Sequence, residues 1–372
     1  MQRQTIAEIN LSALRANYRL LASLASPAPV MAAVKADAYG HGAIEVSRCL
    51  ADEGCRIFAV VTLGEALELR EAGIAGDILV MGVADPCRAD EVLAADVVVT
   101  LHGLEHATEF EAAARAAGGR VRCHIMADTG MHRLGMDFRR TVELAARLKG
   151  ADGLAVEGLM THMSHSEQAD LDRTEFQLAN LRRVISELES RGLRPPVVHA
   201  ANSATLMRRP DARFDAVRPG ITLYGINPCR AYARGVPLRL VMTLSAPVAL
   251  VKQVQPGEGV SYGHLWRATV PSRIAALPIG YRDGYPRALT NRAVVRVEGG
   301  LAPVVGSVCM DTTLIDVTAI PEAAVGSRAT LIEADADSPL SVYALAELLD
   351  TIPHEIVCRI GSRVRRVFID EG

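Results

Sequence analysis

The sequence predicts an α/β fold: a (β/α)₈ barrel of the TIM type, followed by a mostly β C-terminal domain. Over the first two-thirds of the chain, short apolar runs alternate with amphipathic stretches of helical spacing. No GxGxxG turn follows the first apolar run, which argues against an open dinucleotide-binding sheet. After residue 235 the helical spacing stops, and short alternating runs separated by Gly and Pro begin. We therefore predict two domains, 1–235 and 236–372.

The barrel strands are predicted from the apolar runs between turn residues. These runs are 29–35, 57–61, 78–82, 97–101, 121–127, 155–162, 197–201 and 216–218. One more strand, near residues 5–8, precedes the alternation and is a candidate to pack with the C-terminal domain. A long helix is predicted over 172–191. The residues expected on its buried face are Phe176, Leu181, Val184, Ile185 and Leu188.

The C-terminal domain is predicted from alternating runs of the kind that form half-buried strands. These runs are 240–254, 274–279, 293–297, 304–308, 313–317 and 329–332. Glu298-Gly299-Gly300 suits a tight hairpin turn. Only 342–349 is predicted as a helix in this part of the chain.

Composition excludes several classes of protein. The 372 residues are 49% apolar, enough for a large core. The formal charge is −3 with no basic stripe, so we expect no nucleic-acid partner. No apolar run reaches the length of roughly 18 residues that a membrane span requires, and Met1–Ile6 lacks a secretory signal core. The seven cysteines form no CxxC pair or metal-ligand spacing, which predicts free thiols, no metal and a cytoplasmic protein.

Lys35 is the first candidate for chemistry. It ends the apolar run Pro29–Val34 and precedes a glycine-rich turn, so it lies half inside the protein at a strand end. Burial favours the neutral amine, which is a nucleophile able to form a Schiff base. The alternative is a lysine that extends from a strand end into solvent.

Four further polar motifs follow predicted barrel strands. They are 128–135, 161–162, 199–204 and 218–221. In a TIM-type barrel the C-terminal ends of the strands meet at one face, where active sites are built. These motifs and Lys35 are therefore expected at the same mouth of the barrel.

The stretch Ala33–Gly42, AVKADAYGHG, is similar to the pyridoxal-phosphate (PLP) attachment motif of the alanine racemases, two-domain enzymes of PLP fold type III. Other segments resemble the same family in the same order, so the resemblance covers nearly the whole chain. These segments are 260–263, 279–287, 309–311 and 358–366.

The resemblance implies a cofactor site in the barrel. Lys35 would carry PLP, Arg218 would face its pyridine nitrogen, His162 would lie near its ring, and His199 would support Arg218. Residues implied to hold the cofactor phosphate are Tyr39, Ser203, Gly220 and Ile221. Taken singly, Gly220 also suits an ordinary turn, Ser203 a helix cap, and Arg218 a surface charge.

The resemblance also implies that the β domain completes the partner subunit's site in a homodimer. Tyr262 would be the second catalytic base, and it would reach the partner's lysine together with Tyr281 and Met310. The Met310 N–H would bind the substrate carboxylate, because a thioether cannot donate. Cys309 and Asp311 would flank Met310 near the site, but Cys309 by itself is better explained as a small buried apolar residue. Without the resemblance, Tyr262 is better explained as a sheet tyrosine with its hydroxyl in water.

Two positions depart from the family pattern. Arg133 resembles the arginine that touches the cofactor's phenolic oxygen and the substrate carboxylate. Many relatives orient it with a carbamylated lysine, but Met126 stands at that place, seven residues earlier. Methionine cannot be carbamylated, so Arg133 needs another acceptor, a water or an anion. His354 replaces the usual tyrosine on the phosphate, which predicts a wider gate and lower cofactor affinity.

The predicted function is a PLP-dependent racemase that interconverts L- and D-alanine by two bases. Lys35 would serve the D-specific face and Tyr262 the L-specific face, as the resemblance implies. Two alternatives remain open. One is a racemase for a larger or polar amino acid such as serine, lysine or arginine, and the other is a non-catalytic PLP-binding protein.

Overall fold

The computed structural model describes residues 5–233 and 235–370. The chain forms two compact units, each described by itself. The larger unit comprises Leu14–Ala38 and Ala43–Leu238, and the smaller unit comprises Met1–Ala13, Tyr39–Gly42 and Arg239–Gly372.

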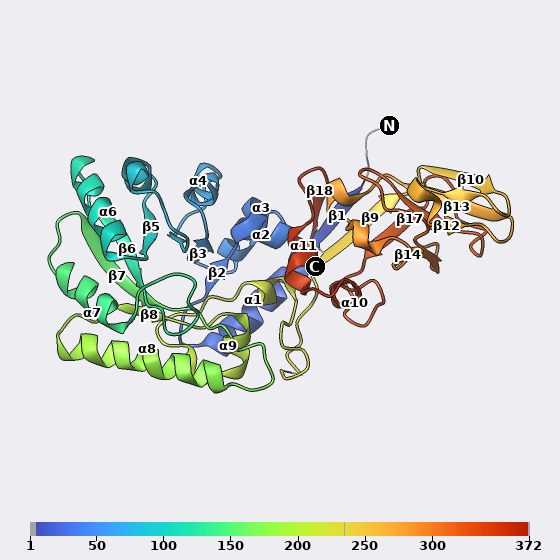
Figure 1. The fold of residues 1–372 in the computed structure, drawn as a ribbon. Coiled ribbons are helices and arrows are strands. Elements are labelled where there is room, and N and C mark those ends of the chain that lie inside the picture. Colours follow the sequence, from blue (N-terminus) through green and yellow to red (C-terminus); the bar gives the residue numbers. More distant parts are fainter. Residues whose placement is uncertain (1–4, 234, 371–372) are drawn as a thin grey trace. The chain divides into compact units, whose positions relative to one another are not determined.

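The larger unit is built on a parallel sheet of seven strands in sequence order (Figure 1). Its strands are β2 (Met31–Ala33), β3 (Ile57–Val60), β4 (Asp77–Val80), β5 (Val97–Leu101), β6 (Val121–Met126), β7 (Leu154–Met160) and β8 (Val197–His199). Seven of the eight predicted barrel strands are thereby confirmed. Short apolar runs form such strands because both faces of a parallel sheet are covered.

The eighth predicted strand, 216–218, is a pair of isolated parallel bridges rather than a strand. Val217 bridges to Val30 ahead of β2, and Ala216 bridges to His199 of β8. The Met31 N–H donates to Val217 O at 2.8 Å, and the Val217 N–H donates to Pro29 O at 3.1 Å. This short segment therefore joins the first and last strands, and the barrel fold class is confirmed.

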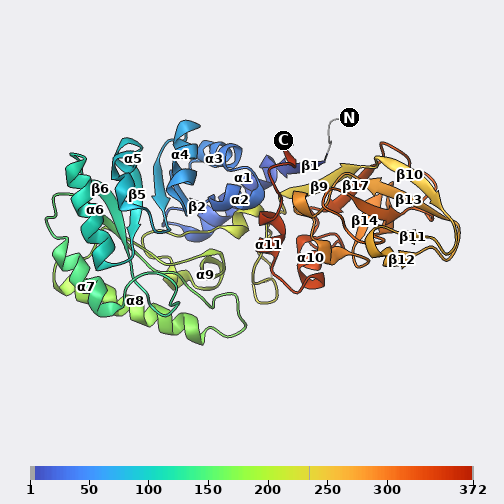
Figure 2. The same cartoon turned by 45° about the horizontal axis from the view of Figure 1, so that its top comes forward.

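Helices cover the outer side of the curled sheet, as Figure 1 and Figure 2 show for α4 to α8. The helices of this region are α1 (Leu11–Ala25), α3 (Ala43–Asp52), α4 (Leu63–Glu71), α5 (Ala89–Ala94), α6 (Leu104–Ala116), α7 (Phe138–Arg147), α8 (Asp172–Ser190) and α9 (Ser203–Arg208). α4 begins with a capping box, in which the Glu65 N–H donates to the Thr62 hydroxyl and the Thr62 N–H donates to the Glu65 carboxylate.

The inside of the barrel is filled by side chains from different strands. The cluster consists of Met31, Leu79, Val98, Met126, Met160 and Ala216, each at most 5% exposed. The barrel interior is therefore a packed core rather than a pore.

Helix α8 exists as predicted, but its predicted buried face is partly wrong. Phe176 is 54% exposed, whereas Leu181, Val184 and Leu188 are buried. Counting back from Leu181 by three and four residues gives the buried Leu178 and Gln177 rather than Phe176. A polar residue therefore occupies a place on the buried face where an aromatic residue was expected.

The smaller unit is mostly β. A six-stranded sheet has the order β15-β14-β17-β9-β1-β18, and smaller sheets are formed by β10-β13-β16 and β11-β12. The strands are β1 (Ile6–Asn10), β9 (Met242–Pro247), β10 (Leu250–Val254), β11 (Gly259–Val260), β12 (Trp266–Arg267), β13 (Ser272–Leu277), β14 (Val294–Val297), β15 (Gly300–Pro303), β16 (Thr313–Asp316), β17 (Arg328–Ile332) and β18 (Arg365–Ile369). β1, from the start of the chain, lies between β9 and β18.

The predicted hairpin at Glu298-Gly299-Gly300 is confirmed. Gly300 pairs with Val297, so Glu298 and Gly299 form a two-residue turn with φ of 46° and 80°. The predicted strand at 304–308 is wrong. Because the turn is so tight, the returning strand already begins at Gly300, and only Val304 makes an isolated bridge, to Ile315.

The prediction of a single helix in this region is also wrong. α10 (Val342–Leu348) is followed by a second helix, α11 (Pro353–Cys358). Pro353 takes the first helical position, where its fixed φ is favourable and its missing N–H costs nothing. The proline that marks a helix start was the available signal.

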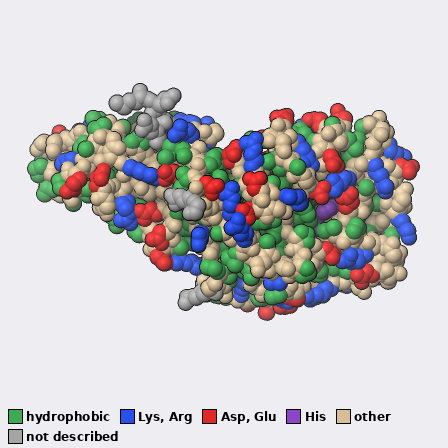
Figure 3. Space-filling model, turned by 180° about the vertical axis from the view of Figure 1, so that it is seen from behind, with side chains coloured by type: hydrophobic (Ala, Val, Ile, Leu, Met, Phe, Trp, Pro, Cys, Tyr) green, Lys and Arg blue, Asp and Glu red, His purple; other side chains and the backbone are tan. Residues whose placement is uncertain are grey.

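The surface carries charges of both signs. In Figure 3, Lys and Arg side chains are interspersed with Asp and Glu side chains over the visible face. Within the described ranges, no helix has the length and apolar character to cross a membrane.

Two Gly→Ala substitutions, one in the hairpin turn and one in helix α4, are expected to change stability differently. At Gly299 an added Cβ meets no atom within 4 Å, so only the φ of +80° matters, and Gly299→Ala is expected to lower the free energy of unfolding by about 1 kcal/mol. At Gly64, inside α4, the nearest atom is 3.8 Å away, and Gly64→Ala is expected to be neutral or stabilising by up to about 1 kcal/mol. Urea unfolding of both variants measures the difference, and a destabilised Gly64→Ala would contradict it.

Candidate active site

Lys35 begins a left-handed turn, α2 (Lys35–Gly40), directly after β2. Left-handed backbone costs a residue with a side chain roughly 1–2 kcal/mol, and such strain concentrates at functional sites. The residues with positive φ are Ala36 (54°), Asp37 (52°), Ala38 (52°), Tyr39 (53°) and Gly40 (80°). Lys35 itself is half-buried, as predicted from its place at the end of an apolar run.

Hydrogen bonds from outside the turn hold it in this conformation. The Glu65 carboxylate accepts from the Ala36 N–H at 2.7 Å and from the Val61 N–H at 2.8 Å, besides capping α4. At Gly40 a Cβ would lie 2.3 Å from Val357 O, so only glycine fits there. One carboxylate thus fixes both the start of α4 and the backbone next to Lys35.

Arg218 is the buried charge of the site, at 4% exposure. Its Nη1 donates to His199 Nδ1 at 2.5 Å, and its Nη2 donates to Thr161 O at 2.5 Å. Because a guanidinium only donates, His199 Nδ1 must accept, and His199 Nε2 must carry the proton. That Nε2 therefore donates to His124 Nδ1, 2.8 Å away.

The charge of Arg218 keeps the neighbouring histidines neutral. Burial lowers the pKa of Arg218 to about 10, so the guanidinium stays charged at neutral pH. Burial and then Arg218 hold the pKa of His199 well below its usual value and lower the pKa of His124 to about 4. Burial, Arg218, Arg133 and Lys35 together lower the pKa of His162 to about 3. The site is therefore electropositive, with neutral imidazoles.

One donor of Arg218 has no acceptor in the described part of the chain. Its Nε is buried and makes no hydrogen bond. A buried unpaired donor is costly, so this atom needs a ligand acceptor. An unprotonated ring nitrogen, such as that of PLP, fits this requirement because it accepts one hydrogen bond.

Ser203 and Gly220 meet as predicted from their positions after successive strands. The Gly220 N–H donates to Ser203 Oγ at 2.9 Å, and the Thr222 hydroxyl donates to the same oxygen at 3.0 Å. Ile221 begins the short 3-10 turn η3 (Ile221–Tyr224) that follows. Because Ser203 Oγ accepts from both groups, its own O–H is left to donate, which suits an anionic ligand such as a phosphate.

Tyr39 and His354 meet in the smaller unit. Their ring centroids are 6.2 Å apart, with the planes tilted by 49°. The histidine at this family position therefore contacts the tyrosine that was predicted to bind phosphate.

Arg133 lies on a loop whose two ends are joined by backbone hydrogen bonds. At the neck, the Asp128 N–H donates to Met136 O at 2.7 Å, and the Met136 N–H donates to Met126 O at 3.0 Å. The Asp128 carboxylate accepts from the N–H groups of Gly130, Met131 and His132 at 3.0–3.1 Å. The Arg133 side chain is exposed and makes no hydrogen bond or ion pair with any described residue.

The predicted C-terminal residues lie on neighbouring loops of the smaller unit. The Ser307 hydroxyl donates to Tyr262 O at 2.9 Å, and the Tyr281 N–H donates to Cys309 O at 3.0 Å. The side chains of Tyr262 (76%), Met310 (51%) and Tyr281 (42%) are exposed.

Asp311, the last residue of the Cys-Met-Asp segment, is anchored away from these side chains. Its carboxylate pairs with Arg363 at 2.7 Å, and Arg363 also pairs with the buried Asp283 at 2.9 Å. We infer that Asp311 holds the end of this segment through an ion pair.

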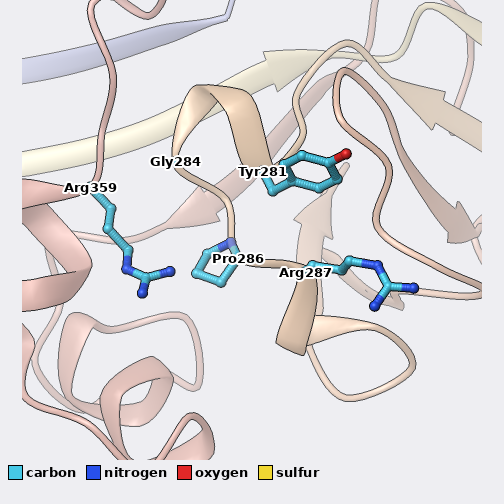
Figure 4. Close-up of a pocket in the computed structure, with 5 residues that line it drawn as sticks. All are labelled: Tyr281, Gly284, Pro286, Arg287 and Arg359. Atoms are coloured by element: carbon cyan, nitrogen blue, oxygen red, sulfur yellow. The ribbon is translucent and has the colours of Figure 1, made fainter.

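Tyr281 also lines a pocket of about 370 Å³ (Figure 4). The other residues that line it are Gly284, Pro286, Arg287 and Arg359. Figure 4 shows the Arg359 side chain extending toward Pro286 and that of Arg287 pointing away from it, so the two guanidinium groups do not converge on one point.

Sequence reasoning missed His124 and Gln177. His124 lies two residues before Met126 on β6, on the same side of the strand, so alternation was a usable signal. Gln177 carried no such signal, because a polar residue in a helix is usually exposed. Its 1% exposure follows from the loops that pack over α8.

Comparison with known proteins gives a uniform result. The family description "Alanine racemase, N-terminal domain" matches residues 9–228, and "Alanine racemase, C-terminal domain" matches residues 241–368. The alanine racemase of Desulfovibrio desulfuricans is 38% identical over 365 residues, 98% of each chain.

Solved structures agree. The alanine racemase of Streptomyces coelicolor has a TM-score of 0.92 at 38% identity, covering 99% of this chain and 98% of its own. The Bacillus anthracis alanine racemase with bound L-Ala-P has a TM-score of 0.93 at 33% identity, covering 100% and 96%.

The neutral histidines predict a loss of stability in acid. The unfolded chain binds a proton near pH 6.5, whereas folded His124 binds one only near its pKa of about 4. Stability is therefore fully present above pH 6.5 and falls as the pH drops toward 4, by about 1–2 kcal/mol per such histidine between pH 7 and pH 5. His124→Asn is expected to reduce this loss in urea unfolding relative to the wild-type protein. Equal pH dependence in the variant and the wild type would contradict the assignment.

Proposed function

The chain belongs to the alanine racemase family, and we propose that it interconverts L-alanine and D-alanine with PLP as its cofactor. The observation that carries the proposal is the buried Arg218 Nε, a donor without an acceptor beside a cluster of phosphate-type donors. The relatives reported above are named alanine racemases, and both domain families match. A polar-substrate racemase and a non-catalytic PLP-binding protein are therefore disfavoured.

The residues of the barrel suit PLP. In the proposal, Lys35 binds the cofactor, Arg218 Nε donates to the ring nitrogen, and His162 lies near the ring. The phosphate set remains Tyr39, Ser203, Gly220, Ile221 and His354. When bound, PLP withdraws electrons from the substrate Cα–H bond and makes this hydrogen acidic. Arg218 limits that withdrawal, because a guanidinium cannot give the ring nitrogen its proton.

Two bases on opposite faces of the substrate perform the inversion. Lys35 Nζ removes or returns the proton on the D-specific face, and the phenolic oxygen of the partner subunit's Tyr262 does so on the L-specific face. Arg133 and the Met310 N–H bind the carboxylate. This N–H has no acceptor among the described residues, which leaves it available.

We propose a homodimer, in which 1–235 binds the cofactor and 236–372 completes the partner's site. The exposure of Tyr262, Tyr281 and Met310 supports this, because large apolar and aromatic side chains gathered on a surface mark interaction sites. All seven cysteines are free thiols, which supports a cytoplasmic location.

A chiral assay tests the function directly. The purified protein with added PLP is expected to convert either enantiomer of alanine to a 1:1 mixture, because the free energies of the enantiomers are equal. Serine, lysine and arginine form the comparison panel. Faster turnover of any of these than of alanine, or no racemisation of any amino acid, would refute the proposal.

Tyr262→Phe tests the two-base assignment. Racemisation should fall by roughly 10²- to 10⁴-fold, because the proton donor on one face is lost. Exchange of the Cα hydrogen with deuterium should persist for D-alanine, whose face Lys35 serves, and should be lost for L-alanine. NMR of each enantiomer in D₂O measures both. Lys35→Ala is the control and should abolish exchange of both enantiomers, and equal loss in Tyr262→Phe would count against the assignment.

A further inference from the structure

We propose that Gln177, buried on α8, is a positioning residue that holds the Arg133 loop in place. The Arg133 loop is residues 128–135, and the loop after β7 is residues 161–171. The proposal rests on the proposed function, in which Arg133 binds the substrate carboxylate. Gln177 acts on Arg133 through the loop, without touching substrate.

Every hydrogen-bonding position of the Gln177 amide is used. Its Nε2 donates to His162 O at 2.9 Å and to Thr129 Oγ1 at 3.4 Å. Its Oε1 accepts from the N–H and from the hydroxyl of Ser164, both at 2.9 Å. Two donors and two acceptors are the full capacity of an amide, so this side chain joins the two loops to α8 in a single orientation.

Thr129 is the point at which the Arg133 loop is attached. Its hydroxyl lies 2.8 Å from the Thr161 hydroxyl, and its carbonyl accepts from Asn180 Nδ2 at 2.9 Å. Thr161 O in turn accepts from Arg218 Nη2 at 2.5 Å. A continuous hydrogen-bonded chain thus runs from Arg218 through Thr161 and Thr129 to Gln177.

Besides Gln177, Thr161 and Asn180, all of which bond to Thr129, little restrains the Arg133 loop as a body. Its neck consists of two backbone bonds, and the Asp128 contacts are internal to the loop. The Arg133 side chain has no hydrogen-bonding partner in the described part of the chain. Met126 provides none, since it is 5% exposed and packed in the barrel core. Without Gln177 the loop keeps only the Thr161 and Asn180 bonds at Thr129, so it opens about its neck more often, and Arg133 moves with it.

Limited proteolysis tests the loop independently of catalysis. Trypsin cleaves after arginine, so the Arg133–Leu134 bond reports how often the loop opens. Gln177→Met keeps the length of the side chain and removes its hydrogen bonds, and should speed this cleavage about tenfold. Gln177→Glu keeps the acceptors for Ser164 but loses the donors, and should lie between. The control Gln168→Met changes an exposed glutamine and should behave as wild type.

Steady-state kinetics separates positioning from general stability. In Gln177→Met, the KM for alanine should rise about tenfold with a smaller change in kcat, because Arg133 binds the substrate carboxylate less tightly. PLP binding, followed by its absorbance, should be unchanged. A folded Gln177→Met with the wild-type cleavage rate and wild-type KM overturns the proposal.

Should Gln177→Met fail to fold, Thr129→Val removes the bonds of the Thr129 hydroxyl to Gln177 and Thr161, and an unchanged cleavage rate in that variant overturns the proposal. Should the wild-type protein show no racemase activity, the proposed function fails. The cleavage rates of the Gln177 and Gln168 variants then still decide whether Gln177 holds the loop.

Discussion

A single buried guanidinium organises the barrel site. Burying a charge is costly unless hydrogen bonds replace water, and Arg218 obtains these from His199 and from the carbonyl of Thr161. Each of these partners is a neutral acceptor, so the charge is solvated but not cancelled. The effect of Arg218 extends through His199 to His124, because the proton position on His199 determines which nitrogen of His124 must accept. The remaining donor, Nε, has no acceptor among the described residues, and a ligand ring nitrogen would supply one.

The two sides of the site are made rigid by different means. Next to Lys35 the backbone is held in a strained left-handed turn, at a cost of roughly 1–2 kcal/mol for each of four residues with side chains. The Glu65 carboxylate helps to offset that cost by accepting from the Ala36 N–H after β2 and from the Val61 N–H after β3. Around Arg133 the backbone is held instead by polar side chains, Asp128 within the loop and Gln177 beneath it. Strain restricts the first segment, and satisfied hydrogen bonds restrict the second.

The methionine at position 126 connects the core to the site. Its side chain belongs to the apolar interior of the barrel, where a charged group would need partners. Apolar packing therefore continues to the end of β6. The hydrogen bonds that hold the Arg133 loop must come from residues outside the barrel core. The hydrogen-bonded threonines at 129 and 161 lie where that support begins.

Local patterns were sufficient for the order of the barrel strands β2 to β8, the hairpin at Glu298-Gly299, and the placement of Lys35 at a strand end, because burial periodicity and turn chemistry are properties of neighbouring residues. The resemblance to a known family supplied the remaining site residues, and the contacts of Ser203 with Gly220 and of Arg218 with His199 agree with it. Phe176 and the segment 304–308 were misjudged, because apolar character alone does not say which side of a helix or which end of a hairpin is covered.

The left-handed turn and the burial of Gln177 had no counterpart in the local pattern, and the pattern predicted a full strand at 216–218 where the barrel is closed by two bridges. Each depends on a partner far along the chain: Glu65 for Ala36, Thr129 for Gln177, and Val30 for Val217. Such partners exist only after the strands have assembled, because hydrogen bonds form between groups that folding brings within about 3 Å. Residue type and spacing prescribe which groups need a partner, and the assembled barrel selects which partner each one receives.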